Sequence, residues 1–230
     1  MRIVYTNTPL IEAVFEFAPQ EAEFEASSIH RLDSHFKSDY AGLQDEIHGM
    51  PITLGYKDGK PFISHPDPLT CFRRWNSTKS RLIQFSKELC AFNALAPYTH
   101  FEDYIPAIQN LFANYSSETK AKETLFLGQR YINKVVLPSE SDLAADFFCF
   151  YPKFSGFKTG GHQAFSLSIE IDVLSGENQG QVILSLVYKG LENTQPVYIL
   201  DFYARTPKTP SIPFEWERVL AWQKNAHVSI

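Results

Sequence analysis

The sequence predicts an α+β fold built from two tandem halves with antiparallel sheets. Two long apolar strands support this prediction, one over residues 9–17 and the other over residues 124–137. Each strand precedes a helix signal, a group of further strands and a closing amphipathic helix. The spacing of apolar residues also changes to a period of two from residue 51, which is typical of strands rather than helices.

The opening strand alternates between two faces, as a half-buried strand does. One face carries Ile11, Ala13, Phe15 and Phe17, and the other carries Glu12, Val14 and Glu16. Pro19 ends the strand, and we expect a helix from about residue 20, followed by a loop at Gly42 and Gly49. The apolar residues of this helix recur at roughly helical spacing, at Phe24, Ile29, Leu32, Phe36 and Tyr40.

Antiparallel strands are expected in the rest of the first half. Residues 52–56 lead into Asp58-Gly59, which is a strong signal for a two-residue hairpin turn. Further strands are predicted over residues 71–75, 82–86 and 89–95. A capping box at residues 99–102 then predicts the start of a helix. The apolar stripe of this helix contains Phe101, Tyr104, Ile105, Ile108, Leu111, Phe112 and Tyr115.

The second half repeats the order of the first. After the strand at residues 124–137, the Pro-Ser-Glu-Ser-Asp segment at residues 138–142 is a helix-start signature. Leu143, Phe147 and Phe150 give this short helix an apolar stripe. The remaining predicted elements are three strands near residues 163–174, 181–189 and 196–204, and a last helix from about residue 214.

The element order of each half is β-α-β(3-4)-α. This order matches the helix-grip or TBP-like architecture, in which a curved antiparallel sheet wraps a long helix. We therefore expect an N-terminal half over residues 1–120 and a C-terminal half over residues 121–230, packed as one globular unit. Internal duplication is a hypothesis, because the residue-level similarity between the halves is faint. The order is compatible with one continuous sheet or with two halves side by side.

Composition and charge narrow the classes of function. The net charge of −5, from 21 basic and 26 acidic residues, disfavours a nucleic-acid-binding protein, which usually has a basic face. Three widely spaced cysteines without a CxxC motif are typical of buried free thiols in a reducing cytosol. The N-terminus lacks a long apolar segment. No apolar stretch reaches the length of about 18 residues that a membrane span needs, so we expect a cytoplasmic protein without a membrane span.

The charged residues of the two long strands form the most interesting polar cluster. Glu12 and Glu16 are four apart on one strand. They are hence about 13 Å apart, which exceeds the carboxylate separation of glycosidases. We therefore interpret them as a solvated strand face. Arg130 and Lys134 share the face of Ile132, where they could hold an anion or an acidic partner. We prefer a structural interpretation, in which the two basic residues pair with Glu12 or Glu16 across neighbouring strands.

A basic hairpin is predicted over residues 72–87. Its basic and aromatic residues are Arg73, Arg74, Trp75, Lys79, Arg81 and Lys87. Such groups occur together on surfaces that bind nucleic acids. A hairpin of this composition is also ordinary on an acidic protein, and the rest of the chain supplies no basic stripe. Nucleic-acid binding is therefore a less favoured interpretation.

No catalytic, metal or cofactor motif is recognisable. His30 and His35 are five apart, so they do not share a helix face as a metal-binding pair would. The glycine-containing segment at residues 156–161 lacks the Gly-Lys-Ser/Thr order of a phosphate loop and precedes a strand instead of a helix. We therefore predict no catalytic residues, no metal site and no cofactor, and we lean against an enzyme.

Three segments resemble a known bacterial family. They are Asn7–Phe17, which contains Pro-Leu-Ile-Glu-Ala, Leu127–Lys134, which reads Leu-Gly-Gln-Arg-Tyr-Ile-Asn-Lys, and Trp222–His227, which ends in Ala-His. A family of sporadically distributed, uncharacterised bacterial proteins shares similar segments in the same order. The resemblance supplies no catalytic residues. The patchy distribution of the family implies a mobile system, such as phage defence or toxin–antitoxin, and its longer C-termini imply a last helix cut short at Ile230.

These observations lead to three hypotheses about function. Aromatic residues make up 14% of the chain. We favour a non-enzymatic protein-interaction or partner-control module, because no chemical site converges and aromatic residues anchor interfaces. Its partner would be a protein encoded next to it, or a second copy as a homodimer. The first alternative is a small-ligand or nucleotide receptor, in which Arg130, Asn133 and Lys134 point into a pocket between sheet and helix. The second alternative is nucleic-acid binding through residues 72–87.

Overall fold

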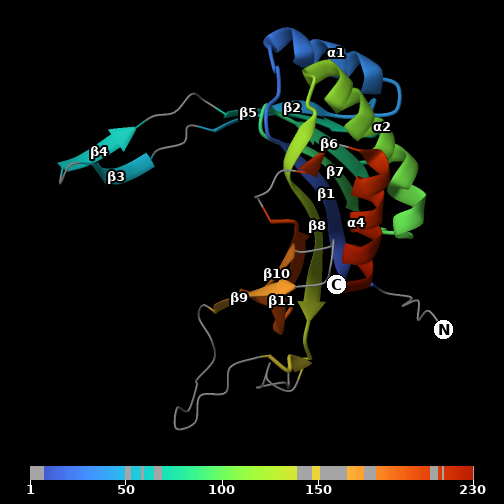
Figure 1. Ribbon diagram of the computed structural model, residues 1–230. Coiled ribbons are helices and arrows are strands. Elements are labelled where there is room, and N and C mark those ends of the chain that lie inside the picture. Colours follow the sequence, from blue (N-terminus) through green and yellow to red (C-terminus); the bar gives the residue numbers. More distant parts are fainter. Residues whose placement is uncertain are drawn as a thin grey trace.

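The computed structural model describes residues 8–49, 53–57, 60–64, 69–138, 147–150, 165–173, 180–207, 212–213 and 215–229. They form helices and a large antiparallel sheet (Figure 1), so the predicted α+β class is confirmed. The first-half elements are β1 (Leu10–Pro19), α1 (Ala26–Phe36), β2 (Gln44–Gly49), β3 (Thr53–Lys57), β4 (Lys60–Ser64), β5 (Leu69–Trp75), β6 (Arg81–Phe85), β7 (Cys90–Leu95) and α2 (Phe101–Thr119). The second-half elements are β8 (Glu123–Val136), β9 (Ser166–Val173), β10 (Gly180–Glu192), β11 (Gln195–Arg205), β12 (Ile212–Pro213) and α4 (Trp216–Ser229).

Apart from β3 and β4, the described strands of both halves share one continuous sheet. Its order is β2-β5-β6-β7-β1-β8-β11-β10-β9, and the short β12 pairs with β8. Neighbouring strands in this sheet run antiparallel. The strands β3 and β4 pair with each other and project away from the large sheet (Figure 1). The first strands of the two halves, β1 and β8, therefore lie side by side at the centre of the sheet.

The register of β1 against β8 determines which polar residues lie together. Val14 pairs with Arg130, and Glu16 pairs with Gly128. A β-bulge between Leu10 and Glu12 shifts the register, because an extra residue is inserted into one strand. Beyond the bulge, alternation places Glu12, Val14 and Glu16 on one face of the sheet.

The three described helices cover the other face. The rings of Phe17 on β1 and Phe112 on α2 meet edge-on with centroids 4.6 Å apart. Leu32 of α1 belongs to the same buried cluster, and the rings of Tyr131 on β8 and His227 on α4 have centroids 5.8 Å apart. Figure 1 shows α1, α2 and α4 gathered on this side of the sheet. Burial of these apolar and aromatic side chains is the main favourable contribution to folding.

The first helix begins later than the sequence predicts. Residues 20–25 are not helical, and α1 starts at Ala26. The backbone N–H of Gln20 donates to the carbonyl of Glu123 at 3.0 Å, and that of Glu23 donates to the carbonyl of Thr119 at 2.8 Å. These bonds extend the pairing of the two halves beyond the end of β1, and a helix over the same residues would lose them.

The strand β2 was not predicted, because Gly42 and Gly49 indicated a loop. In the structure it pairs with β5 at the edge of the sheet. Its sequence is Gln-Asp-Glu-Ile-His-Gly, which lacks the alternating apolar residues that reveal a half-buried strand. Charged residues are common in edge strands because they discourage pairing with other chains. The prediction of a loop was therefore wrong for a physical reason.

The other first-half predictions differ only in detail. The predicted strands correspond to β3, β5, β6 and β7. Lys57 pairs with Lys60, as a two-residue hairpin requires, although Asp58-Gly59 itself lies outside the described residues. The capping box of α2 is formed by His100 and Asp103, one residue later than predicted.

The second-half predictions correspond to β8, β9, β10, β11 and α4. The last helix begins at Trp216, close to the predicted start near residue 214. The short helix predicted after Pro138 falls mainly on residues 139–146, which lie outside the described residues. The segment at residues 156–161 also lies outside them.

Composition gave two further predictions about the whole chain. No helix within the described segments has the length and apolar character needed to cross a membrane. Cys90 is buried and Cys71 is half-buried, but Cys149 is exposed, so the prediction of three buried thiols was wrong for Cys149. Burial raises the pKa of both Cys71 and Cys90, because it disfavours the charged thiolate.

Candidate functional site

The open face of the sheet lies opposite the described helices. Paired residues on neighbouring antiparallel strands share a face, so the register identifies which side chains lie on it. The central part of this face comes from β1, β8 and β11. From here on, the term open face means the residues of this central part: Glu12, Val14, Glu16, Gly128, Arg130, Ile132, Lys134, Val136, Ile199, Asp201 and Tyr203. They include four of the five residues that the sequence proposed for ligand or partner binding.

Arg130 and Asp201 form the central ion pair of the open face. Nε of Arg130 donates to both carboxylate oxygens at 2.9 Å, and Nη2 donates to Oδ2 as well. The arginine side chain is 45% exposed but the aspartate only 12%, so the pair presents its guanidinium to the surroundings. Hydrogen bonding to Asp201 raises the pKa of Arg130. Among the described residues, Nη1 has no acceptor, so a ligand could accept from it.

Glu16 lies against Gly128 and binds Tyr203 across the intervening strand. The Tyr203 hydroxyl donates to Oε1 of Glu16 at 2.6 Å. A side chain at Gly128 would displace the glutamate, because an added Cβ would lie 2.6 Å from that oxygen and 2.7 Å from Cγ of Glu16. Burial raises the pKa of Glu16, while the Tyr203 hydrogen bond and the charge of Arg130 oppose the rise. A glycine in this strand therefore permits close packing of an acidic group.

Glu12 is held from the opposite side by the first half of the sheet. The amide of Asn93 on β7 donates to Oε1 of Glu12 at 2.6 Å, and Gln84 on β6 donates to Oδ1 of Asn93 at 2.8 Å. The two long strands are neighbours as the structural interpretation required. Its predicted ion pairs were nevertheless wrong, because Glu12 and Glu16 bind Asn93 and Tyr203 while Arg130 binds Asp201.

The outer part of the open face combines charge with apolar surface. Nζ of Lys134 lies 2.5 Å from Oε2 of Glu192 on β10. Lys134 pairs with Ile199, and it lies next along the face from Ile132. Val136 ends this row with 43% of its surface exposed. The exposed arginine is the residue of this face whose type is enriched in interface hot spots.

Asn133 belongs to the helix-covered face. It alternates with Ile132 and Lys134, and its side chain donates to the carbonyls of Tyr131 and Leu200, both at 3.3 Å. Arg130 and Lys134 point away from the helices. The proposed pocket between sheet and helix, with Arg130, Asn133 and Lys134 directed into it, is therefore contradicted by the register.

The predicted basic hairpin is divided between the two faces of the sheet. Arg73 and Trp75 lie on the side of the open face, where Arg73 binds Asp45, with Nε donating to Oδ1 at 2.9 Å. Arg74 is 6% exposed and belongs to the helix-covered face. Its guanidinium donates to Asp33 at 2.5 Å, to the carbonyl of Tyr40 at 3.0 Å and to Gln44 at 2.9 Å. The two adjacent arginines therefore form no common surface.

The other basic residues of the hairpin also lie apart. Lys79 is exposed in the turn between β5 and β6, where it has a positive φ of 57°. The guanidinium carbon of Arg81 lies 5.4 Å from the ring centroid of Tyr104 on α2. This is a cation–π contact on the helix side. Lys87 is exposed at the turn that follows β6.

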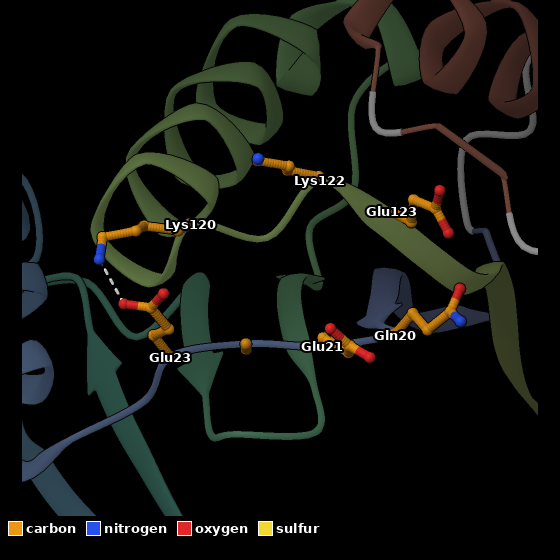
Figure 2. A pocket seen from close by; sticks show the side chains of 7 residues that line it. Gln20, Glu21, Glu23, Lys120, Lys122 and Glu123 are labelled. Carbon is orange, nitrogen blue, oxygen red and sulfur yellow. Dashed lines mark hydrogen bonds and ion pairs between the residues drawn. The ribbon is translucent and has the colours of Figure 1, made fainter.

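A hollow of about 600 Å³ opens where the two halves join, near the end of α2 (Figure 2). Figure 2 shows Lys120 and Glu23 joined by an ion pair at one end, with Glu21, Lys122 and Glu123 along the rest. The Lys120 and Glu23 side chains are each 67% exposed, so the pair contributes little to stability. The mixed charges and their exposure favour no particular ligand.

Groups with metal-binding chemistry do not gather in the described parts of the chain. No cluster of three or more His, Cys, Asp or Glu residues with metal-binding geometry occurs among them. Sequence reasoning missed Asp201, Tyr203 and Asn93, which hold the charges of the open face. The glycine at position 128, inside an apolar strand, was the one local signal of a close approach.

Comparisons with known proteins add no assignment. A scan against protein-family models found no match, and a search of curated proteins found none either. The resemblance of the segments at residues 7–17, 127–134 and 222–227 to the sporadically distributed bacterial family therefore remains a prediction.

Proposed function

We propose that the chain is a non-enzymatic module that binds a partner protein through the open face of its sheet. The observation that carries this proposal is the exposed guanidinium of Arg130, fixed by Asp201 on the same face of the sheet as Ile132, Ile199 and Val136. Arginine is enriched among the residues that contribute most of the binding energy at protein interfaces. The partner would bring a carboxylate to Nη1 of Arg130 and an apolar side chain to Ile132 and Ile199.

The charge of the open face favours a protein over a nucleic acid. Glu12, Glu16 and Asp201 accompany Arg130 and Lys134, so acidic groups outnumber basic ones. Phosphate backbones are bound by an excess of lysine and arginine. A face with both signs of charge is better matched by a protein surface with complementary charges.

The rigid support of these side chains also suits binding. Arg130 is oriented by three hydrogen bonds and Glu16 by Tyr203, so little side-chain freedom remains to be lost on association. Both groups are held by strands of a continuous sheet instead of a loop. The carboxylates of the open face are already hydrogen-bonded, Glu12 to Asn93, Glu16 to Tyr203 and Asp201 to Arg130, which suits a fixed binding surface.

We also propose that the two halves are tandem helix-grip units. In each half the last strand of the described meander returns to lie beside the first, as β7 beside β1 and β11 beside β8. The closing helices α2 and α4 then contact each other over the central strands. In the mobile-system setting implied by the family resemblance, the partner is a protein encoded next to this chain.

A matched pair of surface variants tests the proposed interface. Val136 is 43% exposed on the open face, whereas Leu191 is 67% exposed and alternates onto the helix side. Tagged wild type, Val136→Glu and Leu191→Glu would be used for affinity purification from the native host, with quantitative mass spectrometry. We expect one protein to be lost with Val136→Glu and kept with Leu191→Glu. Equal recovery with both variants, or no protein above background with wild type, would refute the proposal.

A further inference from the structure

A second site lies away from the open face, in a hollow of about 340 Å³ between the end of α1 and the start of α2. Its walls come from the end of α1, the turn between β5 and β6, and the first turns of α2. The lining residues are Phe36, Asp39, Tyr40, Asn76, Arg81, Asp103, Pro106, Ala107 and Asn110. A volume of this size lies within the range of sites for small molecules, about 300–1,000 Å³.

Arg81 differs from the other described arginines. Six of the seven form ion pairs with carboxylates: Arg31, Arg73, Arg74, Arg130, Arg205 and Arg218. Arg81 forms none within the part of the chain that the structure describes. Its guanidinium instead lies over the ring of Tyr104, 5.4 Å from the centroid. Stacking on an aromatic ring orients an arginine while leaving its N–H groups available for a planar anion.

Two carboxylates face the same hollow. Asp39 accepts a hydrogen bond from the neighbouring Ser38 hydroxyl at 3.1 Å. Asp103 accepts from the backbone N–H of His100 at 3.3 Å. Hydrogen bonds with Thr99 and with this N–H lower the pKa of Asp103. Aspartates are anionic acceptors at neutral pH. A doubly charged phosphate would be repelled by two carboxylates, whereas an ammonium group would be attracted.

The remaining wall is apolar. Phe36 and Tyr40 are almost fully buried, and Pro106 and Ala107 add further apolar surface from α2. Burial raises the pKa of Tyr40, so its phenol stays neutral. The hollow thus offers one cation, two anions and an apolar wall within a small volume.

We propose that this hollow binds a free α-amino acid. Arg81 would bind its carboxylate, Asp39 or Asp103 would bind its ammonium group, and the wall of Phe36, Tyr40, Pro106 and Ala107 would contact its side chain. The two charged ends of such a zwitterion match the two kinds of charge in the hollow. This site is separate from the open face, so the protein would respond to a metabolite as well as to a partner.

The test is a thermal-shift and calorimetric screen of the full chain with the common free amino acids at millimolar concentration. A ligand that binds only the folded state raises the unfolding temperature. We expect at least one amino acid to bind, and its deaminated acid and decarboxylated amine to bind at least about tenfold more weakly. Arg81→Gln should weaken binding by a similar factor. The matched variant Arg31→Gln, which alters an exposed arginine outside the hollow, should bind like wild type.

Two further substitutions keep the test decisive. Asp39→Asn and Asp103→Asn each change an exposed residue, and at least one of them should weaken binding of the amino acid, even if Arg81→Gln unfolds the chain. Val136→Glu should leave binding unchanged, because it alters only the open face. The proposal is overturned if no amino acid raises the unfolding temperature of wild type. It is also overturned if Asp39→Asn and Asp103→Asn both bind like wild type, or if inorganic phosphate binds in preference.

Discussion

Tyr203 of β11 donates a hydrogen bond to Glu16 of β1 across the intervening strand β8. The hydroxyl lies 2.6 Å from Oε1 of the glutamate, and the contact passes over Gly128. The bond joins two residues that are 187 positions apart in the chain. It therefore connects the two halves through side chains as well as through the backbone pairing of β1 with β8.

Glu16→Gln should make the free energy of unfolding less dependent on pH. Burial raises the pKa of this carboxyl in the folded state above its usual value of 4.5, so the folded protein holds the proton more tightly than the unfolded chain. Its contribution to stability is then fully present below about pH 4.5 and is lost as the pH rises through the folded pKa. In urea unfolding from pH 4 to pH 7, the free energy of unfolding of the variant should rise relative to that of wild type as the pH increases. A constant difference would contradict the assignment.

Gly128→Ala should lower the free energy of unfolding by about 1–3 kcal/mol through overpacking. The added Cβ would lie 2.6 Å from Oε1 and 2.7 Å from Cγ of Glu16. Combining it with Glu16→Ala removes those atoms, so the double variant should lose less stability than the sum of the single variants. Denaturant unfolding of wild type, the two single variants and the double variant measures the coupling free energy between the two positions. Strict additivity would show that the glutamate is not the obstacle.

Arg74→Ala should destabilise the protein far more than Arg73→Ala. The Arg74 side chain is 7% exposed, and its loss leaves the partly buried Asp33 unpaired. Such an unpaired charge costs about 3 kcal/mol or more. The exposed fractions of the Arg73 and Asp45 side chains are 26% and 32%. A pair with this exposure is worth about 1 kcal/mol or less. Chemical denaturation measures both, and similar losses for the two variants would contradict the assignment of the arginines to opposite faces.

The three thiols should react in the order of their exposure. Cys149 is exposed, Cys71 is half-buried and Cys90 is fully buried, with burial raising the pKa of the last two. Because the thiolate is the reactive form, a thiol reagent near pH 8 should label Cys149 first and Cys90 only on unfolding. Peptide mapping by mass spectrometry identifies the labelled sites. Early labelling of Cys90 would contradict its place in the core.

The long strands at the centre of the sheet could be predicted from the sequence. The apolar alternation of residues 9–17 is a local property, and it indicates both the strand and its two faces. β2 could not be predicted, since an edge strand with residues such as Asp45 and Glu46 has no apolar periodicity to reveal it.

The polar partners on the open face could not be predicted either. Asp201 lies 71 positions from Arg130, and no local pattern indicates that the two meet. Their contact depends on β11 returning to lie beside β8, which is a property of the whole sheet. The sequence suggested Glu12 and Glu16 as partners of Arg130 and Lys134, because it indicated only that the two long strands occupy equivalent places in the two halves. It identified the right charged residues but paired them wrongly.

Site-specific photo-crosslinking tests the central claim most directly. A photoreactive phenylalanine analogue would replace Val136 on the open face or Leu191 on the helix side, and cells of the native host would be irradiated. We predict a discrete crosslinked partner protein from position 136 that is weakened by Lys134→Glu, and no such product from position 191. No crosslink from position 136, or the same product from both positions, would contradict binding through the open face.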